Sequence, residues 1–309
     1  MPRFDVTIAG ELNLDLILYG LPAELPRERE LLADRMMLTL GSSSAIFAHN
    51  LAALGSRVGF QSLVGNDELG QIALNRLSDS GADTSLVRRA DGSQTGLTVI
   101  LQRKEGRNIL TYLGTIAELT LAHLDLDYLS DARHFHLSSY YLQNALHSHV
   151  PELFRRLKAA GLTISLDTND DPEDEWGGLE DVLRNVDIFL PNEREACKIA
   201  GTRDVRRALE KFSEIVPLVV VKLGKAGAMA RRGDQIWESP AVKVDAVDPV
   251  GAGDSFDAGF LHQHLRGADL ETCLAWGNLA GAFSTTRPGG TEAFRDREHR
   301  GKFFREHSQ

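Results

Sequence analysis

Short apolar runs alternate with segments of helical spacing along most of the chain. Runs such as FDVTIAG (4–10) and PLVVVKLG (217–224) have the length and residue types of strands. The segment SSAIFAHNLAALG (43–55) instead repeats its apolar residues at the spacing of a helix, and Gly55 marks its end. Because strands that alternate with helices pair in parallel through crossover connections, the pattern predicts an α/β fold with a mostly parallel central sheet.

Two regions break this alternation. Residues 12–40 carry apolar runs and prolines without a clear crossover helix, and residues 96–113 have the pattern of a β-hairpin around a charged turn. An antiparallel flap in a parallel α/β domain indicates a lid over a cleft, with an edge extension or a dimer interface as alternatives. We expect the lid segments 12–40 and 96–113 to be inserted into a core of residues 1–11, 41–95 and 114–309.

Composition and charge argue against two classes of protein. The 309 residues include 44 acidic and 34 basic side chains, for a net charge of −10. Phosphate-rich partners need a basic face, so we expect no nucleic-acid or membrane partner. The N-terminal segment lacks the apolar stretch of a secretion signal, and no run approaches the roughly 20 apolar residues of a membrane-spanning helix. Cys197 and Cys273 have no metal-binding spacing, and we expect reduced thiols in a cytoplasmic protein.

The most informative stretch is VDPVGAGDSFDAGFL (247–261), in which a glycine-rich turn enters a helix. Gly251, Ala252 and Gly253 let a ligand approach the backbone N–H groups, and the helix N-terminus favours an anion. Asp254 follows directly and could take a proton from an attacking hydroxyl. Phosphoryl transfer requires this combination of an anion site and a group that orients or deprotonates the nucleophile. The plainer alternative is that Asp254 only caps the helix.

The segment DPVGAGDSFDAGF (248–260) resembles the C-terminal signature of the ribokinase-like, or PfkB, carbohydrate kinases. This resemblance implies a Rossmann-like three-layer core, a small β-sheet lid and transfer of the γ-phosphate of ATP to a sugar hydroxyl. It extends over nearly the whole chain, through GELNLD (10–15), GSSSAIFAHNLAALG (41–55), LVGNDELG (63–70), PNEREA (191–196), VVVKLGKAGA (219–228) and WGNLAGAFSTTRPGG (276–290).

The resemblance also implies roles for residues on the sugar side. Asp254 matches the catalytic base, and Gly251, Ala252 and Gly253 match the anion hole for the transferring phosphoryl group. Asp15 matches the aspartate that holds sugar hydroxyls, a task that suits a carboxylate because it accepts two hydroxyl protons. Without the resemblance, Asp15 would be interpreted as a solvated turn residue. The other candidate substrate residues are Asn13, Gly41, Ser42, Asn50 and Arg107.

A nucleotide and its ions are implied in the same way. Asn192 and Glu195 match the N-x-x-E pair of the family on one helical face, where Glu195 would contact Mg²⁺ through water. The alternatives are that Glu195 complements the helix dipole and that Lys222 is a surface lysine at a strand end. The candidate nucleotide residues are Asn192, Glu195, Lys222, Gly224, Gly227 and Asn278. A monovalent cation such as K⁺ is expected at Asp248, Ser284 and Gly289.

Some positions depart from the family pattern. Ser42 replaces a second glycine after Gly41, and Ile46 replaces an asparagine that touches the sugar. The segment DTNDDPEDEW (167–176) keeps Asp167 and Asn169 of the D-P-N-x-R segment of some sugar-acid and fructose kinases but lacks its arginine. These departures fall where substrate specificity is expected. His134 and His136, on a predicted strand, are interpreted as packing residues.

These features predict a cytoplasmic ATP-dependent kinase for a small unphosphorylated carbohydrate such as ribose, fructose or 2-keto-3-deoxygluconate. A phosphorylated sugar would require clustered cations, and on the sugar side only Arg103, Lys104 and Arg107 of the lid hairpin supply them. A nucleoside kinase is the first alternative. A non-catalytic sugar- or nucleotide-binding regulator is the second, against which an intact Asp254 argues. A homodimer through the lid is also expected.

Overall fold

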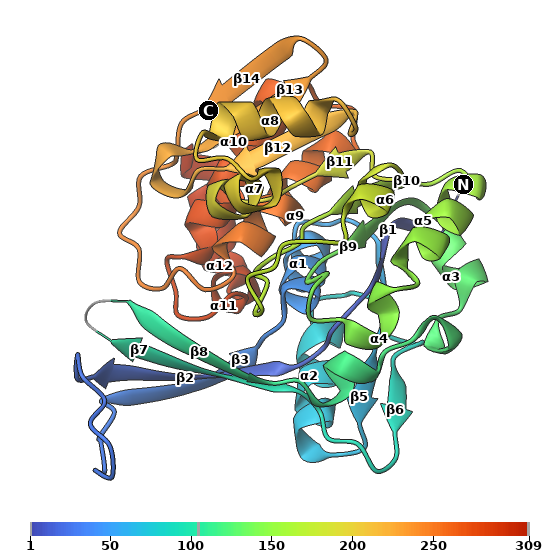
Figure 1. Cartoon of the computed structure of the whole chain (residues 1–309). Coiled ribbons are helices and arrows are strands. Elements are labelled where there is room, and N and C mark those ends of the chain that lie inside the picture. Colours follow the sequence, from blue (N-terminus) through green and yellow to red (C-terminus); the bar gives the residue numbers. More distant parts are fainter. Residues whose placement is uncertain (1, 104–105, 308–309) are drawn as a thin grey trace.

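The central sheet of the computed structural model, which describes residues 2–103 and 106–307, is parallel except at one edge (Figure 1). Neighbours from β12 to β4 pair in parallel, whereas β13 and β14 continue the sheet antiparallel. In spatial order the strands are β14 (Gln235–Ser239), β13 (Ala228–Arg232), β12 (Leu218–Lys222), β11 (Ile188–Phe189), β10 (Thr163–Leu166), β9 (Ala132–Leu137), β1 (Phe4–Ala9) and β4 (Val58–Gln61).

Helices cover both faces of this sheet, as expected for parallel strands joined by crossovers. One face packs against α1 (Ser43–Ala53), α2 (Glu68–Ser78), α9 (Ala252–His264) and α10 (Leu270–Ser284). The other packs against α3 (Leu126–Ser130), α4 (Asn144–His147), α5 (Val150–Ala159), α6 (Glu180–Leu183), α7 (Glu193–Ala200) and α8 (Val205–Ser213). The chain continues after α10 into α11 (Glu292–Arg295) and α12 (Arg297–His307).

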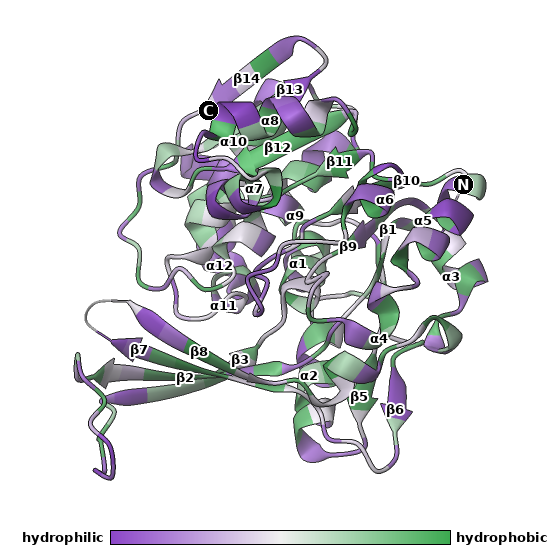
Figure 2. Cartoon of the chain, in the orientation of Figure 1, coloured by the Kyte–Doolittle hydropathy of each residue, from purple (hydrophilic) through white to green (hydrophobic). Residues whose placement is uncertain are grey.

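Strand β12 illustrates why the central strands are apolar throughout. Leu218 and Val220 belong to the apolar cluster on one face, and Val219 and Val221 belong to the cluster on the other. Successive side chains of a strand point to opposite faces, so a strand buried on both sides needs an unbroken apolar run. Figure 2 shows this contrast between the hydrophobic β12 and the hydrophilic outer surface of α8.

A separate four-stranded sheet projects from the core (Figure 1). We call it the lid sheet. It consists of β3 (Arg35–Leu40), β2 (Leu14–Leu21), β7 (Leu97–Arg103) and β8 (Arg107–Tyr112), in that order. The strands β7 and β8 form the predicted antiparallel hairpin, and β2 pairs with β7 in parallel. A third, two-stranded sheet contains β5 (Leu63–Gly65) and β6 (Arg88–Ala90).

The two faces of the lid sheet differ. Cross-strand register places Asp15 beside Thr98 and Ile17 beside Ile100, so these four side chains share a face. Ile17 and Ile100 pack against Val250, next to the glycine-rich turn that enters α9. This face of the lid sheet therefore points toward the turn, and the opposite face points away from it.

The predicted α/β fold with a mostly parallel sheet and a small additional sheet is confirmed. The domain boundaries and the closing of the lid sheet over a cleft stay predictions, and Lys104 lies outside the described residues. His134 and His136 pack in β9 as expected, because both are buried and share hydrogen bonds with Ser165. Across the described ranges, no helix is both long and apolar enough to cross a membrane.

Candidate active site

Gly251, Ala252 and Gly253, here called the glycine turn, are the N-cap and the first two residues of α9. Gly251 is the N-cap of the helix and has φ 71°, a left-handed conformation that favours glycine. A Cβ on Gly251 would also lie 2.7 Å from the Cα of Gly290, so a side chain there would clash. The first N–H groups of a helix have no partner within the helix. The Ala252 N–H donates to Pro249 O over 3.3 Å, and the turn can offer its other N–H groups to an anion.

Asp254 lies in the first turn of α9 and is almost fully buried. Because Gly251 is the N-cap, the interpretation of Asp254 as a mere helix cap is wrong. The Asn169 amide nitrogen donates to Asp254 Oδ1 over 3.5 Å. Burial, followed by the negative charge of Asp167, raises the pKa of Asp254 to about 6. A carboxylate with this pKa can accept a proton at neutral pH.

Asp15 is buried in β2, which contradicts its interpretation as a solvated turn residue. Burial raises the pKa of Asp15 to about 7, the charges of Asp254 and Asp248 add to this effect, and Arg107 opposes it. A Cβ on Gly41 would lie 2.1 Å from Asp15 Oδ1, so the glycine permits this close approach. The charges of Asp254, Asp248 and Arg107, which come from distant parts of the sequence, thus all act on Asp15.

Lys222 ends β12 and is buried between two carboxylates. Its Nζ lies 2.7 Å from Asp167 Oδ2 and 3.0 Å from Asp257 Oδ2. These two carboxylates hold the pKa of the Lys222 ammonium above its usual value in spite of burial. The interpretation of Lys222 as a surface lysine is therefore wrong. The Nζ atom also lies 3.6 Å from the position of a Cβ on Gly253, so its charge is placed against the glycine turn.

Asn192 and Glu195 form a capping box at the start of α7. Asn192 Oδ1 accepts from the Glu195 N–H, and Glu195 Oε2 accepts from the Asn192 N–H over 2.9 Å. Burial and the charge of Asp167 raise the pKa of Glu195 to about 8, while Lys222 opposes the rise. The pair therefore has a structural role at the helix start. The carboxylates of Glu195 and Asp167 repel one another. A cation bound near them, mostly through water, would lower this repulsion.

Asp248 connects the lid sheet to the loop after α10. Its Oδ2 accepts from Tyr19 Oη over 2.7 Å and from the Gly289 N–H over 3.1 Å, and its Oδ1 accepts from the Val250 N–H. The structure therefore brings Asp248 and Gly289 together through the Gly289 N–H, and the monovalent-cation site stays a prediction. Ser284 is the last residue of α10, and its Oγ donates to Gly281 O within the helix. Among the described residues, no group of three or more His, Cys, Asp or Glu side chains could hold a metal ion.

Two predicted substrate residues instead have roles within the protein. The Asn50 amide nitrogen donates to Ser255 Oγ and Gly290 O, and the side chain is fully buried. This geometry does not support the prediction that Asn50 contacts substrate. Ser42 is the N-cap of α1, where its Oγ accepts from the Ala45 N–H and donates to a backbone carbonyl.

The remaining predicted residues lie at the edges of the site. The Asn13 amide nitrogen donates to Leu14 O and lies 3.5 Å from Thr98 Oγ1 of the lid sheet. Gly224 and Gly227 form the turn after β12, where both have positive φ. The Asn278 amide nitrogen donates to backbone and side-chain oxygens of Ser239, beside Gly227. Asn278 and Gly227 are therefore neighbours, as the predicted nucleotide pocket requires.

Sequence reasoning missed three residues of this site. Asp257 follows Asp254 by three residues on α9, a spacing that indicates a shared helix face and could have revealed it. Glu11 is buried, accepts from Ser44 Oγ over 2.7 Å and contributes to the raised pKa of Asp254. Tyr19 lies 229 positions from its partner Asp248, and no local pattern could have indicated that contact.

Comparison with protein-family models shows to which family the chain belongs. Residues 4–297 match the model described as pfkB family carbohydrate kinase. The chain belongs to this family. The resemblance found in the sequence is thereby confirmed. The predicted activity, ATP-dependent phosphorylation of a carbohydrate hydroxyl, is confirmed with it.

Several relatives resemble the kinase over most of their length. It is 30% identical over 280 residues to 2-dehydro-3-deoxygluconokinase of Bacillus subtilis, with 86% of each chain covered. It is also 30% identical over 291 residues to the ATP-dependent ribose-1-phosphate kinase of Halopiger xanaduensis, covering 93% of the kinase and 94% of the relative. An E. coli structure assigned as a ribokinase II, in complex with ATP and Mg²⁺, matches with TM-score 0.85 and 25% identity over 98% of the kinase and 100% of that chain.

Proposed function

We propose that this kinase phosphorylates a small unphosphorylated sugar or sugar acid, with Asp254 as the base and Asp15 as a ligand of the sugar hydroxyls. The observation that carries the proposal is the position of Asp15, which is buried on the face of the lid sheet that points toward the glycine turn. Burial first, and then the charges of Asp254 and Asp248 that act on it there, raise its pKa. A dianionic phosphate beside these carboxylates would be repelled, whereas a neutral diol can donate hydrogen bonds to Asp15. Arg107 offers one cation on the lid sheet, which suits a single substrate carboxylate.

In this mechanism Asp254 takes the proton of the attacking hydroxyl. The N–H groups of the glycine turn stabilise the charge that develops on the transferring phosphoryl group. Lys222 adds positive charge behind Gly253 while Asp167 and Asp257 hold it in place. Bound Mg²⁺ would neutralise charge on the ATP phosphates, and Glu195 and Asn192 would hold it, partly through water.

The named substrates of the relatives support a sugar kinase without choosing between classes. The Bacillus subtilis relative is named for a sugar acid, and the Halopiger relative for a phosphorylated sugar. The acidic surroundings of Asp15 favour the first class. A nucleoside remains the second candidate, because its ribose would offer Asp15 the same diol. We also propose a cytoplasmic location, which accords with the net charge of −10 and the two free cysteines.

The proposal is tested by product formation from ATP over a panel of acceptors. The panel contains ribose, fructose, 2-keto-3-deoxygluconate, nucleosides and fructose phosphates. We expect turnover of an unphosphorylated sugar or sugar acid. In Asp15→Ala, KM for that acceptor should rise while KM for ATP stays unchanged, and Asp34→Ala, an exposed lid aspartate, is the matched control. Turnover of phosphorylated sugars alone would refute the proposed substrate class.

A further inference from the structure

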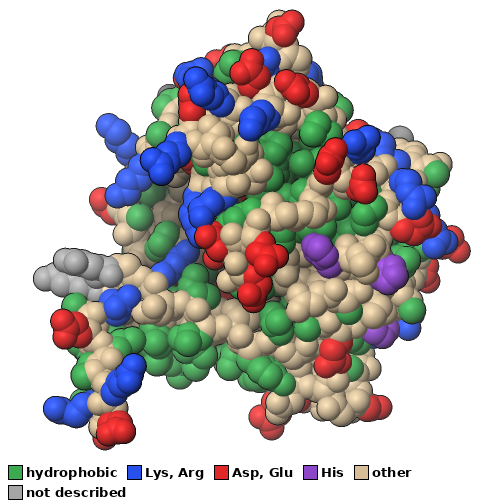
Figure 3. All heavy atoms as spheres, viewed as in Figure 1, with side chains coloured by type: hydrophobic (Ala, Val, Ile, Leu, Met, Phe, Trp, Pro, Cys, Tyr) green, Lys and Arg blue, Asp and Glu red, His purple; other side chains and the backbone are tan. Residues whose placement is uncertain are grey.

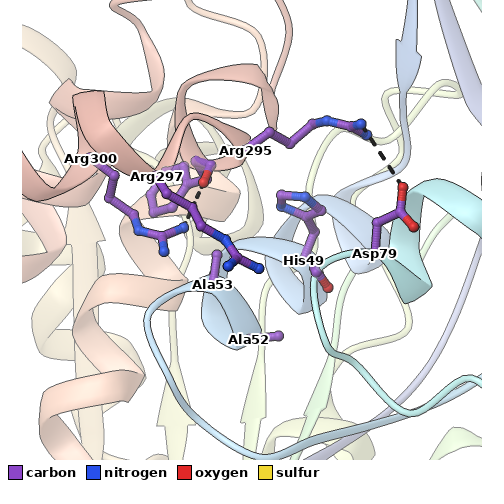
Figure 4. A pocket seen from close by; sticks show the side chains of 9 residues that line it. His49, Ala52, Ala53, Asp79, Arg295, Arg297 and Arg300 are labelled. Atoms are coloured by element: carbon purple, nitrogen blue, oxygen red, sulfur yellow. Dashed lines mark hydrogen bonds and ion pairs between the residues drawn. The ribbon is translucent and has the colours of Figure 1, made fainter.

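A cavity of about 380 Å³ lies outside the candidate active site, between the ends of α1 and α2 and the C-terminal helices α11 and α12 (Figure 4). We call it the arginine cavity. Helix α1 begins at Ser43, beside Gly41 and Asp15, and lines the cavity with His49, Ala52 and Ala53. These positions lie roughly 9–15 Å along the helix from Ser43. The cavity is therefore separate from the glycine turn but connected to its surroundings by one helix.

The charge of the arginine cavity is strongly positive. Arg295, Arg297 and Arg300 line it, and Asp79 is the acidic residue among its lining side chains. Arg295 Nη2 is 4.0 Å from Asp79 Oδ2, and Arg300 Nη1 donates to Phe294 O over 2.6 Å. Partial burial and the charge of Arg297 lower the pKa of Arg300. Arg295 Nε also lies 3.8 Å from Glu292 Oε2, so two carboxylates balance three guanidinium groups. The remaining positive charge would stabilise an anion between the arginines.

His49 supplies a buried polar group at the same cavity. Its Nδ1 lies 2.8 Å from Asn50 Oδ1. The Asn50 amide nitrogen donates to Ser255 and Gly290, so Oδ1 is the acceptor and His49 Nδ1 carries the proton. Burial lowers the pKa of His49 to about 4, and the charges of Arg295 and Arg300 contribute. The neutral ring therefore keeps Nε2 as a hydrogen-bond acceptor, which suits a hydroxyl group of an organic phosphate.

We propose that the arginine cavity is a second ligand site that binds the phosphate group of a small organic phosphate. The guanidinium groups of Arg295, Arg297 and Arg300 would contact the oxygens of the phosphate dianion, and His49 Nε2 would accept a hydrogen bond from a hydroxyl of the organic part. The volume exceeds what one phosphate fills and falls in the range of pockets that take small metabolites. The apolar walls at Ala52, Ala53 and Phe294 would then contact the organic part.

The same residues connect the cavity to the glycine turn. Asn50 joins His49 to Ser255 on α9 and to the carbonyl of Gly290. The Cα of Gly290 packs so closely against Gly251 that a Cβ there would lie 2.7 Å away. A ligand that moves or orders His49 would therefore change the surroundings of the glycine turn. This regulatory consequence rests on the proposed function, whereas binding to the cavity does not.

The site is tested by calorimetric titration of the kinase with the active site saturated by a non-hydrolysable ATP analogue. The probes are inorganic phosphate, ribose 5-phosphate and AMP, which separates a site for the bare anion from one that also contacts an organic group. We expect an organic phosphate to bind the native protein. Arg297→Gln should raise its Kd about tenfold, the scale of one lost charge-assisted contact. Arg305→Gln is the matched control, because Arg305 is exposed on α12 and does not line the cavity.

The following outcomes decide the proposal. If no probe binds the native protein, or if Arg297→Gln and Arg305→Gln bind equally, the site does not exist. Binding of inorganic phosphate as tightly as the organic probes would overturn the organic part of the proposal. If Arg297→Gln does not fold, the ¹⁵N chemical shift of His49 Nε2 in the native protein is followed while the organic phosphate is added. The proposal then requires this shift to change, and an unchanged shift would overturn it. Phosphate-dependent changes in kcat that disappear in Arg297→Gln would support the regulatory step, and binding without such changes would remove that step alone.

Discussion

At the scale of single residues, two buried carboxylates of the candidate active site have raised pKa values. Asp15 and Asp254 have pKa values of about 7 and about 6, in both cases because of burial first and neighbouring carboxylates second. A general base works best when its pKa lies near the working pH, because it is then ionised and still basic. The shift of Asp254 thus fits the role of base. Asp15, with the higher pKa, can exchange hydrogen bonds with a sugar diol in either ionisation state.

We expect Asp254→Asn to lower kcat about 10²–10⁴-fold, the usual cost of removing a general base. Asparagine keeps the size of the side chain but cannot take the proton. Steady-state kinetics should show an unchanged KM for ATP, and Asp234→Asn, on an exposed turn between β13 and β14, is the matched control. A kcat close to that of the native kinase would exclude Asp254 as the base.

The raised pKa of Asp254 also predicts two pH effects. Because the base must be ionised, kcat/KM should fall as the pH decreases through about 6. Because the pKa of Asp254 in the folded state lies above the ordinary value of an aspartate, protonation favours the folded state. This stabilisation is lost as the pH rises through about 6. Asp254→Asn removes this loss, and its melting temperature at pH 8 should therefore equal or exceed that of the native kinase. A clear decrease would contradict the assigned shift.

Lys222 permits a separate stability prediction. Lys222→Met removes the cation between two buried carboxylates, and breaking such a pair typically costs about 3–5 kcal/mol. Urea denaturation should show a loss of that size in the free energy of unfolding. Asp257→Asn added to Lys222→Met should restore part of it, and Lys225→Met, at an exposed position in the next turn, should change little. Equal stabilities of the native protein and Lys222→Met would show that the cluster does not hold Lys222 charged.

At the scale of elements, the sequence was a better guide to single segments than to their contacts. The helix over 43–55 and the strand over 217–224 could be predicted because their apolar spacing is local, and α1 and β12 appear there. The contact between Lys222 and Asp167 could not be predicted. It joins residues 55 positions apart and depends on β11 lying between β10 and β12, which sheet order decides. Likewise, the sequence could not show that the Asn50 amide donates to Gly290 O, because the two residues are 240 positions apart.

The loop after α10 permits a prediction about monovalent cations. Asp248 is buried beside this loop and accepts the Gly289 N–H, and Val247 N–H donates to Thr285 O. A bound K⁺ would fix this loop and add positive charge near the glycine turn. We therefore expect higher rates in K⁺ than in Na⁺ or tetramethylammonium at equal ionic strength. Equal rates in the three salts would remove the cation from the mechanism.

At the scale of the whole molecule, the lid sheet has two different faces. One face carries Asp15 and Thr98 toward the glycine turn. The alternate residues Leu16, Val99 and Leu110 are neighbours across three strands on the opposite face, and apolar side chains cover much of the lid sheet in Figure 3. Leu110 is 53% exposed. Exposed apolar surface on a projecting sheet is typical of an interface. We therefore expect a second copy of the chain to bind this opposite face, here called the outer face of the lid sheet.

We therefore predict a homodimer formed through the outer face of the lid sheet. Size-exclusion chromatography with light scattering should give twice the chain mass of 34.0 kDa for the native kinase. Leu110→Asp buries a charge in that interface, which should cost at least about 2 kcal/mol and weaken the dimer roughly thirtyfold. Ile236→Asp, at an exposed apolar position on the edge strand β14, is the matched control and should leave the dimer intact. A native kinase that is monomeric at high concentration, or a Leu110→Asp variant as dimeric as its control, would assign the outer face another role.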